Sequence, residues 1–342
     1  MTKTTSLEHQ STEHAFAQYV RILGKGKSGT RDLTQAEAEN ALSMILNGEV
    51  EPVQLGAFLM LLRVKEESGA ELAGFVQACR SSMPRAPSTL VADLDWSSYA
   101  GKKHQHPWFI LSILLLTQAG YRVFIHGTRG HTTGRLYTED ALLAMGLPVA
   151  GDWADVEQQL DTTGMSYLPL QHLCPELDTL IQLRPLLGLR SPVHTLVRMF
   201  NPLLAPASIQ SIFHPAYGTL HQQADSILKQ PNALVFKGES GEVEIKPHAD
   251  TRLMFLCEGT MSETPLKRTI TERVASVAQP AVEPLQQLWC TGSADKYGLE
   301  TVLATTAVAL RLLDQGRTRE GSQTLARELW ESREINRLAA CP

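Results

Sequence analysis

The fold class is indicated most clearly by residues 96–138, WSSYAGKKHQHPWFILSILLLTQAGYRVFIHGTRGHTTGRLYT. They divide into a polar loop, an apolar run from Pro107 to Ala119, a short strand from Tyr121 to Ile125 and a second polar loop. Because proline is favoured in the first turn of a helix, the apolar run is expected to be a helix that begins there. A helix followed directly by a buried strand is typical of a parallel sheet in an α/β protein.

Strands and helices continue to alternate outside this stretch. Periodicity predicts further strands at residues 91–94, 233–236, 243–245 and 252–256. It predicts helices at residues 138–145, 297–313 and 318–338. The fold class that follows is α/β, with a mainly parallel central sheet in its larger part.

The first 83 residues are expected to be helical. Thr34-Gln-Ala-Glu37 and Ser68-Gly-Ala-Glu71 have the spacing of capping boxes, and Pro52 suits the first turn of a helix. A proline-rich linker follows at residues 83–88. The sequence therefore predicts a small helical domain at 1–83, joined by helices at 175–202, and a larger α/β domain formed by 88–174 and 203–342.

Composition is typical of a globular protein. The chain has 342 residues, of which 43% are hydrophobic and 20% are charged, which is enough for a large core. No apolar run approaches the roughly 20 residues that span a bilayer, and the N-terminus has no secretory apolar segment. We therefore expect a cytoplasmic protein with no membrane partner.

Cysteine and histidine spacing gives no support for a metal or redox centre. The cysteines are Cys79, Cys174, Cys257, Cys290 and Cys341. They are odd in number, have no Cys-x-x-Cys pair and are expected to be reduced thiols. The eleven histidines form no metal-binding motif either, so no metal site and no cofactor are expected.

Charge is unevenly distributed along the chain. The net charge is −5, which by itself disfavours a nucleic-acid or membrane partner. Residues 96–138 and 179–224, however, contain no Asp or Glu and together carry +8, which leaves −13 for the remainder. A negative mean charge can therefore hide a focused positive site.

The first loop of the opening stretch is a candidate phosphate site. Gly101-Lys-Lys-His-Gln-His106 leads directly into the helix expected at Pro107. The free N–H groups of that helix and the side chains of Lys102, Lys103, His104 and His106 would face one space. A pair of solvated lysines on a surface loop is the equally weighted alternative.

The second loop, His126-Gly-Thr-Arg129, follows a strand immediately. This places it at the carboxyl edge of the sheet, where open α/β folds bind ligands. Gly127 permits close approach to the backbone, and Arg129 and Arg135 lie nearby without acidic partners. A tight turn with exposed polar residues is the alternative.

Two further segments are basic. Arg184, Arg190, His194 and Arg198 predict a cationic helical edge, with an ordinary solvated face as the alternative. Gly24-Lys-Gly-Lys-Ser28 is similar to the end of a nucleotide P-loop, but Arg21 stands where that motif needs glycine and a helix precedes it. We interpret this second segment as a basic turn between helices.

Taken together, these residues resemble the anthranilate phosphoribosyltransferase family over most of the chain. The residues that carry the resemblance are Leu33-Thr-x-x-Glu37-Ala, Pro52-x-Gln54-x-Gly-Ala-Phe-Leu-Met60, Arg63-x-Lys65, His126-Gly-Thr-Arg129, Arg184, Gly188-x-Arg190 and Asn201-Pro202. The resemblance implies a helical dimerisation domain and a nucleoside phosphorylase-like α/β domain. Tyr99-x-Gly-Lys-Lys103 and Arg190-Ser-x-x-His194-Thr are similar to the YbiB-type branch, for which the resemblance implies nucleic-acid binding as a homodimer.

The departures from the enzymes concern the catalytic residues. The enzymes' Gly-Thr-Gly-Gly-Asp loop, which wraps a diphosphate, corresponds to Tyr99-Ala-Gly-Lys-Lys103 here. Their magnesium-binding Asp-Glu pair corresponds to Val243-Glu244 in this chain. The Asn of their His-Gly-Asn-Arg motif corresponds to Thr128. Loss of the glycine loop and of half the metal pair would cost several kcal/mol of transition-state stabilisation. We therefore expect the transfer reaction to be lost and name no catalytic residue.

The expected function is binding of nucleic acid, single-stranded by preference, without sequence specificity. Tyr99 and Trp108 could stack on bases, with a core role as the alternative for Trp108. The expected phosphate-binding residues are Tyr99, Gly101, Lys102, Lys103, His104, His106, His126, Gly127, Thr128, Arg129, Arg135, Arg184, Arg190, His194 and Arg198.

Two other functions stay open. One is a phosphoribosyltransferase that acts on an unidentified acceptor, with Glu244 as a remnant of a magnesium site. The other is a sensor or regulatory protein that binds one phosphorylated metabolite. Salt dependence of nucleic-acid binding, magnesium-dependent turnover and saturable binding of a small ligand would distinguish the three.

Overall fold

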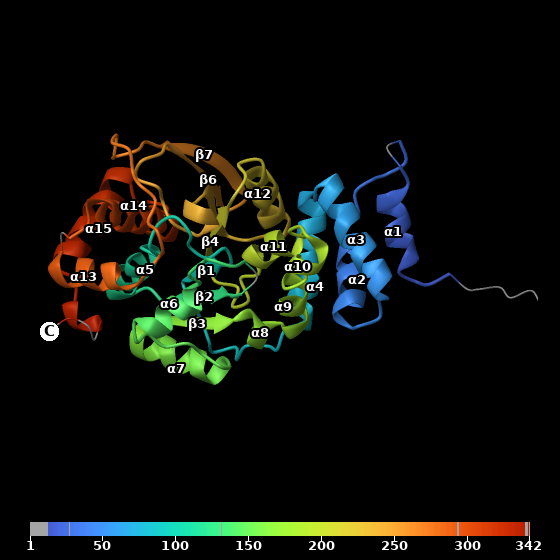
Figure 1. Cartoon of the computed structure of the whole chain (residues 1–342), viewed down its shortest axis with the longest axis horizontal. Helices are drawn as coiled ribbons and strands as arrows, with labels where there is room; N and C mark the ends of the chain where they lie inside the picture. The colour runs from blue at the N-terminus through green and yellow to red at the C-terminus, as the bar shows by residue number, and fades with distance from the viewer. Residues whose placement is uncertain (1–12, 27, 131, 293, 339–340, 342) are drawn as a thin grey trace, which may run out of the picture.

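A seven-stranded mixed sheet forms the centre of the molecule (Figure 1). The computed structural model describes residues 13–26, 28–130, 132–292, 294–338 and 341. The strands are β1 (Leu94–Ser98), β2 (Val123–Gly127), β3 (Met165–Pro169), β4 (Ala207–Ile212), β5 (Asn232–Lys237), β6 (Thr251–Cys257) and β7 (Thr260–Leu266). Their order across the sheet is β3-β2-β1-β4-β5-β6-β7.

The sheet is parallel from β3 to β5, and the last two strands pair antiparallel. Every residue of β1, β2, β3 and β4 is buried, as expected for strands covered on both faces. This confirms the predicted mainly parallel α/β sheet. The strand predicted at 243–245 is wrong: Val243 and Ile245 are buried, but they belong to an irregular loop between β5 and β6.

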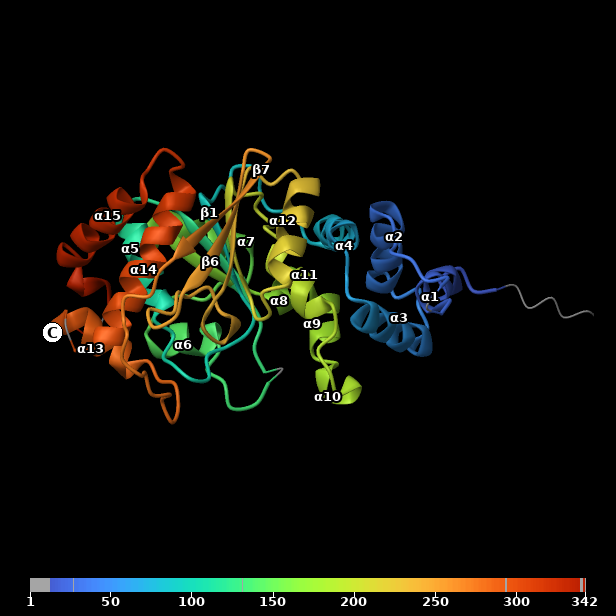
Figure 2. The same cartoon turned by 90° about the horizontal axis from the view of Figure 1, so that it is seen from above.

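Helices cover both faces of the sheet (Figure 2). The helices are α1 (Ala17–Gly24), α2 (Gln35–Leu46), α3 (Pro52–Lys65), α4 (Gly69–Ser82), α5 (Phe109–Gln118), α6 (Thr138–Ala144), α7 (Trp153–Thr163), α8 (Leu170–Leu173), α9 (Pro175–Ile181), α10 (Arg184–Leu187), α11 (Val193–Leu196), α12 (Tyr217–Ile227), α13 (Glu283–Thr291), α14 (Lys296–Leu313) and α15 (Arg319–Glu331), with 3₁₀ turns η1 (Val197–Met199), η2 (Glu239–Gly241) and η3 (Ile335–Arg337). One face carries α5, α13, α14 and α15, and the other carries α4, α11 and α12. Within the described residues, no helix has the length and apolarity needed to cross a bilayer.

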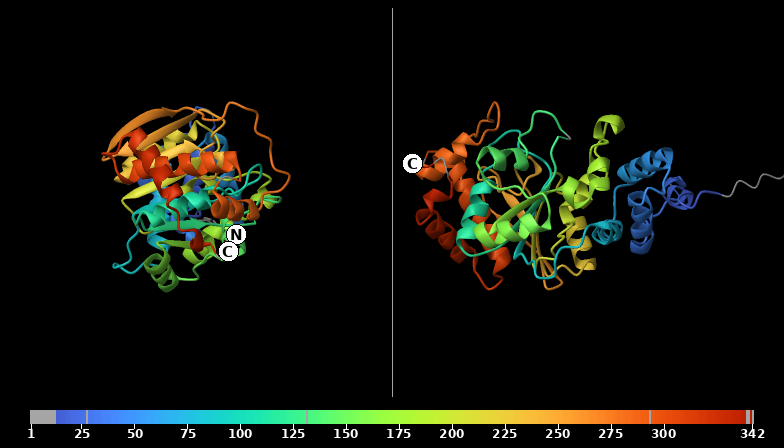
Figure 3. Two further views of the ribbon diagram at one scale, coloured as in Figure 1. Left: turned by 90° about the vertical axis from the view of Figure 1, so that its left-hand side faces the viewer. Right: turned by 90° about the horizontal axis from the view of Figure 1, so that it is seen from below.

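Helices α1–α4 form an all-helical part beside the sheet. Thr34 and Ser68 cap α2 and α4 with the predicted capping boxes, and Pro52 opens α3. Gly74 lets α2 and α4 pack closely, because a Cβ there would lie 2.2 Å from the carbonyl oxygen of Gln35. The segment of α10 projects beside this helical part, as the view from below shows (Figure 3).

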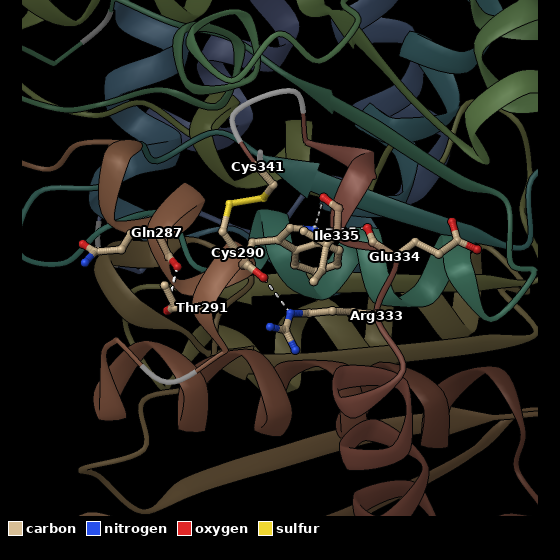
Figure 4. The surroundings of a disulfide bond; sticks show 8 residues. Gln287, Cys290, Thr291, Arg333, Glu334, Ile335 and Cys341 are labelled. Atoms are coloured by element: carbon tan, nitrogen blue, oxygen red, sulfur yellow. Dashed lines mark hydrogen bonds between the residues drawn. A yellow bond between two sulfur atoms is a disulfide. The ribbon is translucent and has the colours of Figure 1, made fainter.

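Cys290 and Cys341 form a disulfide, which corrects the expectation that all five cysteines are reduced (Figure 4). Their sequence separation of 51 residues gave no motif, whereas the fold returns the chain end to α13. Arg333 reinforces the same junction by donating from Nε to the carbonyl oxygen of Trp289 at 2.7 Å. Cys79, Cys174 and Cys257 remain free thiols.

Candidate anion-binding site

The predicted site residues gather at one edge of the sheet. Strands β1, β2, β4 and β5 are parallel, so the loops after Ser98, Gly127, Ile212 and Lys237 leave from the same side. Carboxyl edges of this kind are where open α/β sheets bind ligands. The edge contains two regions with very different electrostatics.

Lys102 lies in the first region and is only 1% exposed. Its Nζ contacts Glu239 at 2.5 Å and also contacts Glu244. Burial lowers the pKa of Lys102, but the two carboxylates outweigh this effect and the pKa is raised overall. The expectation that Lys102 faces a phosphate in a groove is therefore corrected: its charge is used inside the protein.

A third carboxylate, that of Glu242, binds the backbone N–H groups of the loop after β1. Glu242 accepts hydrogen bonds from the backbone N–H groups of Ala100 and Gly101 at 2.7 and 2.6 Å. Its other oxygen accepts one from Ser98 Oγ at 2.7 Å. Gly101 was expected to bind an external phosphate, but a carboxylate of the chain itself already accepts a hydrogen bond from its N–H group.

A carboxylate of the chain also binds the N-terminus of α5. Glu244 Oε2 accepts a hydrogen bond from the N–H group of Phe109 at 2.9 Å. Burial raises the pKa of Glu244 to about 7, and Lys102 opposes that shift. The helix dipole therefore acts on a carboxylate of the chain itself, and the predicted phosphate position does not lie open.

Magnesium does not fit between these carboxylates. Glu239 and Glu244 are the two carboxylates that a metal ion in this region would bind, but the Lys102 ammonium contacts both of them. Within the part of the chain that the structure describes, no three His, Cys, Asp or Glu side chains form a metal-binding group. A positive charge is thus supplied here by a side chain.

His126 and Tyr99 belong to a buried polar chain. Tyr99 Oη lies 2.6 Å from His126 Nδ1, and Asp95 Oδ1 lies 3.2 Å from His126 Nε2. Gly127 is required because a Cβ there would lie 2.1 Å from the carbonyl oxygen of Ser98. The close approach expected at Gly127 is made by the chain's own backbone, and no ligand can contact these side chains directly.

The expected stacking role of the two aromatic residues is also corrected. Tyr99 is 1% exposed and Trp108 is fully buried, so neither presents a ring face to a base. Trp108 packs against α14, where a Cβ on Gly298 would lie 2.7 Å from its ring. The core role considered for Trp108 is therefore confirmed.

Acids that lie just after the stretch 96–138, and one from α9, contact the second loop. Thr128 Oγ1 donates to Asp178 at 2.5 Å, and Arg129 pairs with Glu139 and Asp140 at 3.4 and 3.1 Å. The stretch 96–138 contains no acidic residue, but acids from outside it contact its basic side chains in the folded protein. Its apparent excess of positive charge is therefore mostly compensated.

Three predicted residues of the first loop lie further outward. Lys103 and His104 are exposed, and His106 is half-buried beside the carbonyl oxygen of Ala281 at 3.1 Å. Lys103 is thus the lysine of the pair that is available to solvent. The two neighbouring lysines have opposite environments.

The second region is strongly cationic. Arg135 Nη1 donates to the carbonyl oxygens of Ala100 and Gly101 at 3.0 and 2.8 Å, and Arg184 donates to Thr132 Oγ1 at 2.8 Å. Arg190 is half-buried nearby. Burial, followed by repulsion from Arg198 and two other arginines, lowers the pKa of Arg190 to about 10.

Arg190, His194 and Arg198 line one cavity, although Arg190 lies outside any helix, in the segment that precedes α11. Arg198 is 7% exposed and donates from Nη1 to the carbonyl oxygens of Ser211 and Gly241 at 2.8 and 2.7 Å. Carbonyl oxygens satisfy its N–H groups without cancelling its charge. The cavity therefore retains positive potential.

A buried polar network lies beneath this cavity. Gln210 Oε1 is 2.7 Å from His221 Nδ1, and Gln210 Nε2 donates to both oxygens of Asp225 at 3.1 Å. Burial lowers the pKa of His221 to about 3 and raises the pKa of Asp225 to about 7. Because the amide orientation makes Gln210 Oε1 an acceptor, His221 carries its proton on Nδ1.

Sequence reasoning missed the acids that fill the first region and the aromatic ring at the second. Glu239 and Glu242 follow β5 closely, and their placement after a strand in Gly238-Glu-Ser-Gly-Glu242 was the available signal. Phe213 follows β4 and is 46% exposed at the cavity. An aromatic residue directly after a strand at the carboxyl edge was its signal.

Comparison with protein families gives two matches that together span most of the chain. The glycosyl transferase family, helical bundle domain, matches residues 17–83. The glycosyl transferase family, a/b domain, matches residues 110–333.

Individual relatives agree with these matches. The chain is 29% identical over 237 residues to the uncharacterized protein YbiB of Escherichia coli K12, which covers 68% of this chain and 73% of that protein. It is 27% identical over 321 residues to the anthranilate phosphoribosyltransferase of Symbiobacterium thermophilum, which covers 91% and 92% of the two chains.

Solved structures have the same fold. Anthranilate phosphoribosyltransferase from Thermus thermophilus superposes with a TM-score of 0.77 at 20% identity, covering 94% of this chain and 96% of that one. The Saccharomyces cerevisiae enzyme in complex with PRPP and Mg gives a TM-score of 0.78 at 15% identity, with coverage of 95% and 96%. The shared architecture is the helical bundle joined to the α/β sheet.

Proposed function

Because the chain belongs to the anthranilate phosphoribosyltransferase-like glycosyl transferase family, we propose that it is a member that binds nucleic acid without sequence specificity and no longer transfers a phosphoribosyl group. The observation that carries this proposal is the contrast at the carboxyl edge. The N–H groups of the first loop donate hydrogen bonds to a carboxylate of the chain itself. In contrast, no carboxylate of the described residues lines the neighbouring arginine cavity.

The filled region supports loss of the transfer reaction. A diphosphate at the loop after β1 would have to displace Glu242 from Ala100, Gly101 and Ser98. It would then lie close to that displaced carboxylate in a site where like charges repel strongly. Lys102 also holds the carboxylates that a magnesium ion would need.

The open region supports binding of a polyanion. Arg190 and Arg198 line the cavity, and Arg184, Arg135 and the exposed Lys103 extend positive charge along the same edge. Phosphate contacts of this kind supply affinity without reading sequence. Phe213, half exposed beside the arginines, offers the ring on which a base of a single strand can stack.

Assembly as a homodimer is part of the proposal. Val53 and Val64 on α3 are 78% and 83% exposed, and Leu186 on α10 is 85% exposed. Exposed apolar side chains that lie together on a surface favour contact with another protein. Light scattering of the purified full chain would measure its mass, and a single 37.7 kDa species would contradict the dimer.

Titration of a labelled single-stranded oligonucleotide by fluorescence anisotropy tests the proposed binding. Affinity should fall steeply between about 50 and 200 mM salt, because phosphate contacts release counterions. Arg190→Gln should weaken binding of unrelated sequences equally. Arg327→Gln, an exposed arginine on α15 at the opposite face, is the matched control.

Two outcomes would contradict the proposal. Affinity that does not change with salt would exclude a phosphate-tracking surface. Unchanged affinity in Arg190→Gln would place the interface elsewhere.

Transferase activity is the second candidate. It is favoured by the match to an anthranilate phosphoribosyltransferase over 91% of this chain. It is also favoured by the donors of Ser98, Ala100 and Gly101, which would bind a diphosphate if Glu242 moved away. Incubation with PRPP, magnesium and a panel of amine and base acceptors tests it. Release of diphosphate that depends on both acceptor and magnesium would establish turnover and overturn the proposed loss of catalysis.

A further inference from the structure

The cavity that holds Arg190 lies where the helical part meets the sheet. Arg63 enters it from α3, and Ser191 and Arg198 enter it from the segment around α11. Phe213 enters from the loop after β4, and Tyr217 enters from the start of α12. It encloses about 570 Å³, including its open mouth. Groups from distant parts of the chain therefore surround one space of small-ligand size.

No acidic side chain of the described residues lines this cavity. Arg190 forms no ion pair or hydrogen bond with any residue that the structure describes, and its neighbours are themselves cationic. Arg63 donates to Tyr217 Oη at 3.1 Å, and the buried Glu67 carboxyl, which does not line the cavity, interacts with both side chains. An anion in this space would relieve repulsion among the arginines.

Ser191 gives an independent indication of a ligand. It lines the cavity, is 4% exposed, and its Oγ has no hydrogen-bond partner within the described part of the chain. Buried hydroxyl groups are normally hydrogen-bonded, and an unsatisfied one needs an explanation. An acceptor oxygen that enters the cavity would satisfy it.

We propose that this cavity binds a phosphate monoester. A monoester carries about −1.5 to −2 charge and three terminal acceptor oxygens, which suits several guanidinium groups and a hydroxyl that converge from different elements. Ser191 and Arg198 are both less than one tenth exposed, so the group that contacts them must enter the cavity. A monoester enters on one sugar linkage, whereas an internal diester would need room for two.

The monoester can come from two sources. One is the terminal phosphate of a bound strand, which rests on the proposed function. The other is a free nucleoside monophosphate, which does not rest on it. Both sources present the same group to Arg190 and Ser191.

The strand source is tested with three oligonucleotides of one sequence, about 12 nucleotides long to match a single binding site. They carry a 5′-phosphate, a 3′-phosphate or no terminal phosphate, with the fluorophore at an internal position. One phosphorylated form should bind the full chain about tenfold tighter than the unphosphorylated form. Arg190→Gln and Ser191→Ala should each remove this increment, and Arg327→Gln should keep it.

The free-nucleotide source is tested by calorimetry with adenosine 5′-monophosphate, adenosine and inorganic phosphate. Saturable binding of the monophosphate that is lost in Arg190→Gln, without binding of adenosine, supports the proposal. If Arg190→Gln has a lowered melting temperature, Ser191→Ala replaces it in both experiments, because this substitution removes only one hydroxyl group.

The outcomes separate the two proposals. Equal affinity for all three oligonucleotides, together with no Arg190-dependent binding of the monophosphate, overturns the monoester site while leaving nucleic-acid binding in place. Binding of the monophosphate without binding of any oligonucleotide supports the monoester site and overturns the proposed function. An increment that persists in both variants overturns the assignment to this cavity.

Discussion

Lys102 and Arg190 lie at the same edge of one sheet, and both come from acid-free segments of the sequence, yet their environments are opposite. Lys102 is buried and contacts two carboxylates, whereas Arg190 lines a cavity among other arginines. The difference shows that a run of basic residues indicates a binding surface only when no acid reaches it through the fold. Glu239, Glu242 and Glu244 reach the first region, and no acid of the described residues lines the second.

The contrast also separates two uses of positive charge. In the first region an ammonium and three carboxylates hold the β5–β6 loop against the β1–α5 loop, so the charges stabilise structure. In the second region the charges repel one another and favour a ligand. Substitutions in each region test that division.

Lys102→Met should have the largest effect on stability. Removing the ammonium leaves Glu239 and Glu244 buried without their partner, and breaking a buried pair in this way costs about 3–5 kcal/mol. Urea denaturation followed by circular dichroism measures the loss. Adding Glu244→Gln should restore part of it, because the second substitution removes the stranded charge.

A small loss of stability in Lys102→Met would contradict the difference between the two regions. If Lys102→Met unfolded at the wild-type urea concentration, the ammonium would have to be solvated, and the first region would resemble the second.

Glu242→Ala should open the filled region. The N–H groups of Ala100 and Gly101 would lose their acceptor, at a cost of about 1–3 kcal/mol for the unsatisfied donors. The same donors would then bind an added anion, so pyrophosphate should raise the melting temperature of the variant more than that of the wild type. Equal shifts in both proteins would mean that Glu242 does not block this position.

Asp225 and His221, beneath the cavity, should respond to pH in opposite directions. The folded-state pKa of His221 is about 3 against an ordinary 6.5, so stability is lost as pH falls below 6.5. The folded-state pKa of Asp225 is about 7 against 3.8, so stability is gained as pH falls below 7. Between about pH 7 and 5 each contributes about 2 kcal/mol, and the two cancel.

Single substitutions expose the two contributions. Asp225→Asn should lose about 2 kcal/mol relative to the wild type on moving from about pH 7 to 5, and His221→Asn should gain a similar amount. Denaturation at the two pH values measures both. Parallel pH profiles for all three proteins would mean that neither group titrates as its burial dictates.

Much of the fold could be predicted from local pattern. The capping boxes at Thr34 and Ser68 and the first-turn Pro52 act within one turn of helix, so their signal is complete in the sequence. Strand β2 was found because its apolar run is short and bounded. The stretch 243–245 was mistaken for a strand because burial, which it shares with strands, does not require pairing.

The site was less predictable because its decisive contacts are long-range. Lys102 meets Glu244 across 142 residues, and Cys290 meets Cys341 across 51. Nothing near Lys102 in the sequence distinguishes it from Lys103. The cavity was anticipated better, since Arg190, His194 and Arg198 are close in the sequence and needed no distant partner to be placed together.

Lys103→Gln should have the smallest effect and is the most direct comparison with Lys102. Because Lys103 is exposed, its loss should change the free energy of unfolding by less than about 0.5 kcal/mol. If Lys103 contacts one phosphate of a bound single strand, the slope of log affinity against log salt should decrease by about 0.7. Anisotropy titrations over a salt series measure that slope. An unchanged slope would confine the interface to the arginine cavity, while a loss of stability comparable to that of Lys102→Met would show that the two lysines do not divide between interior and surface.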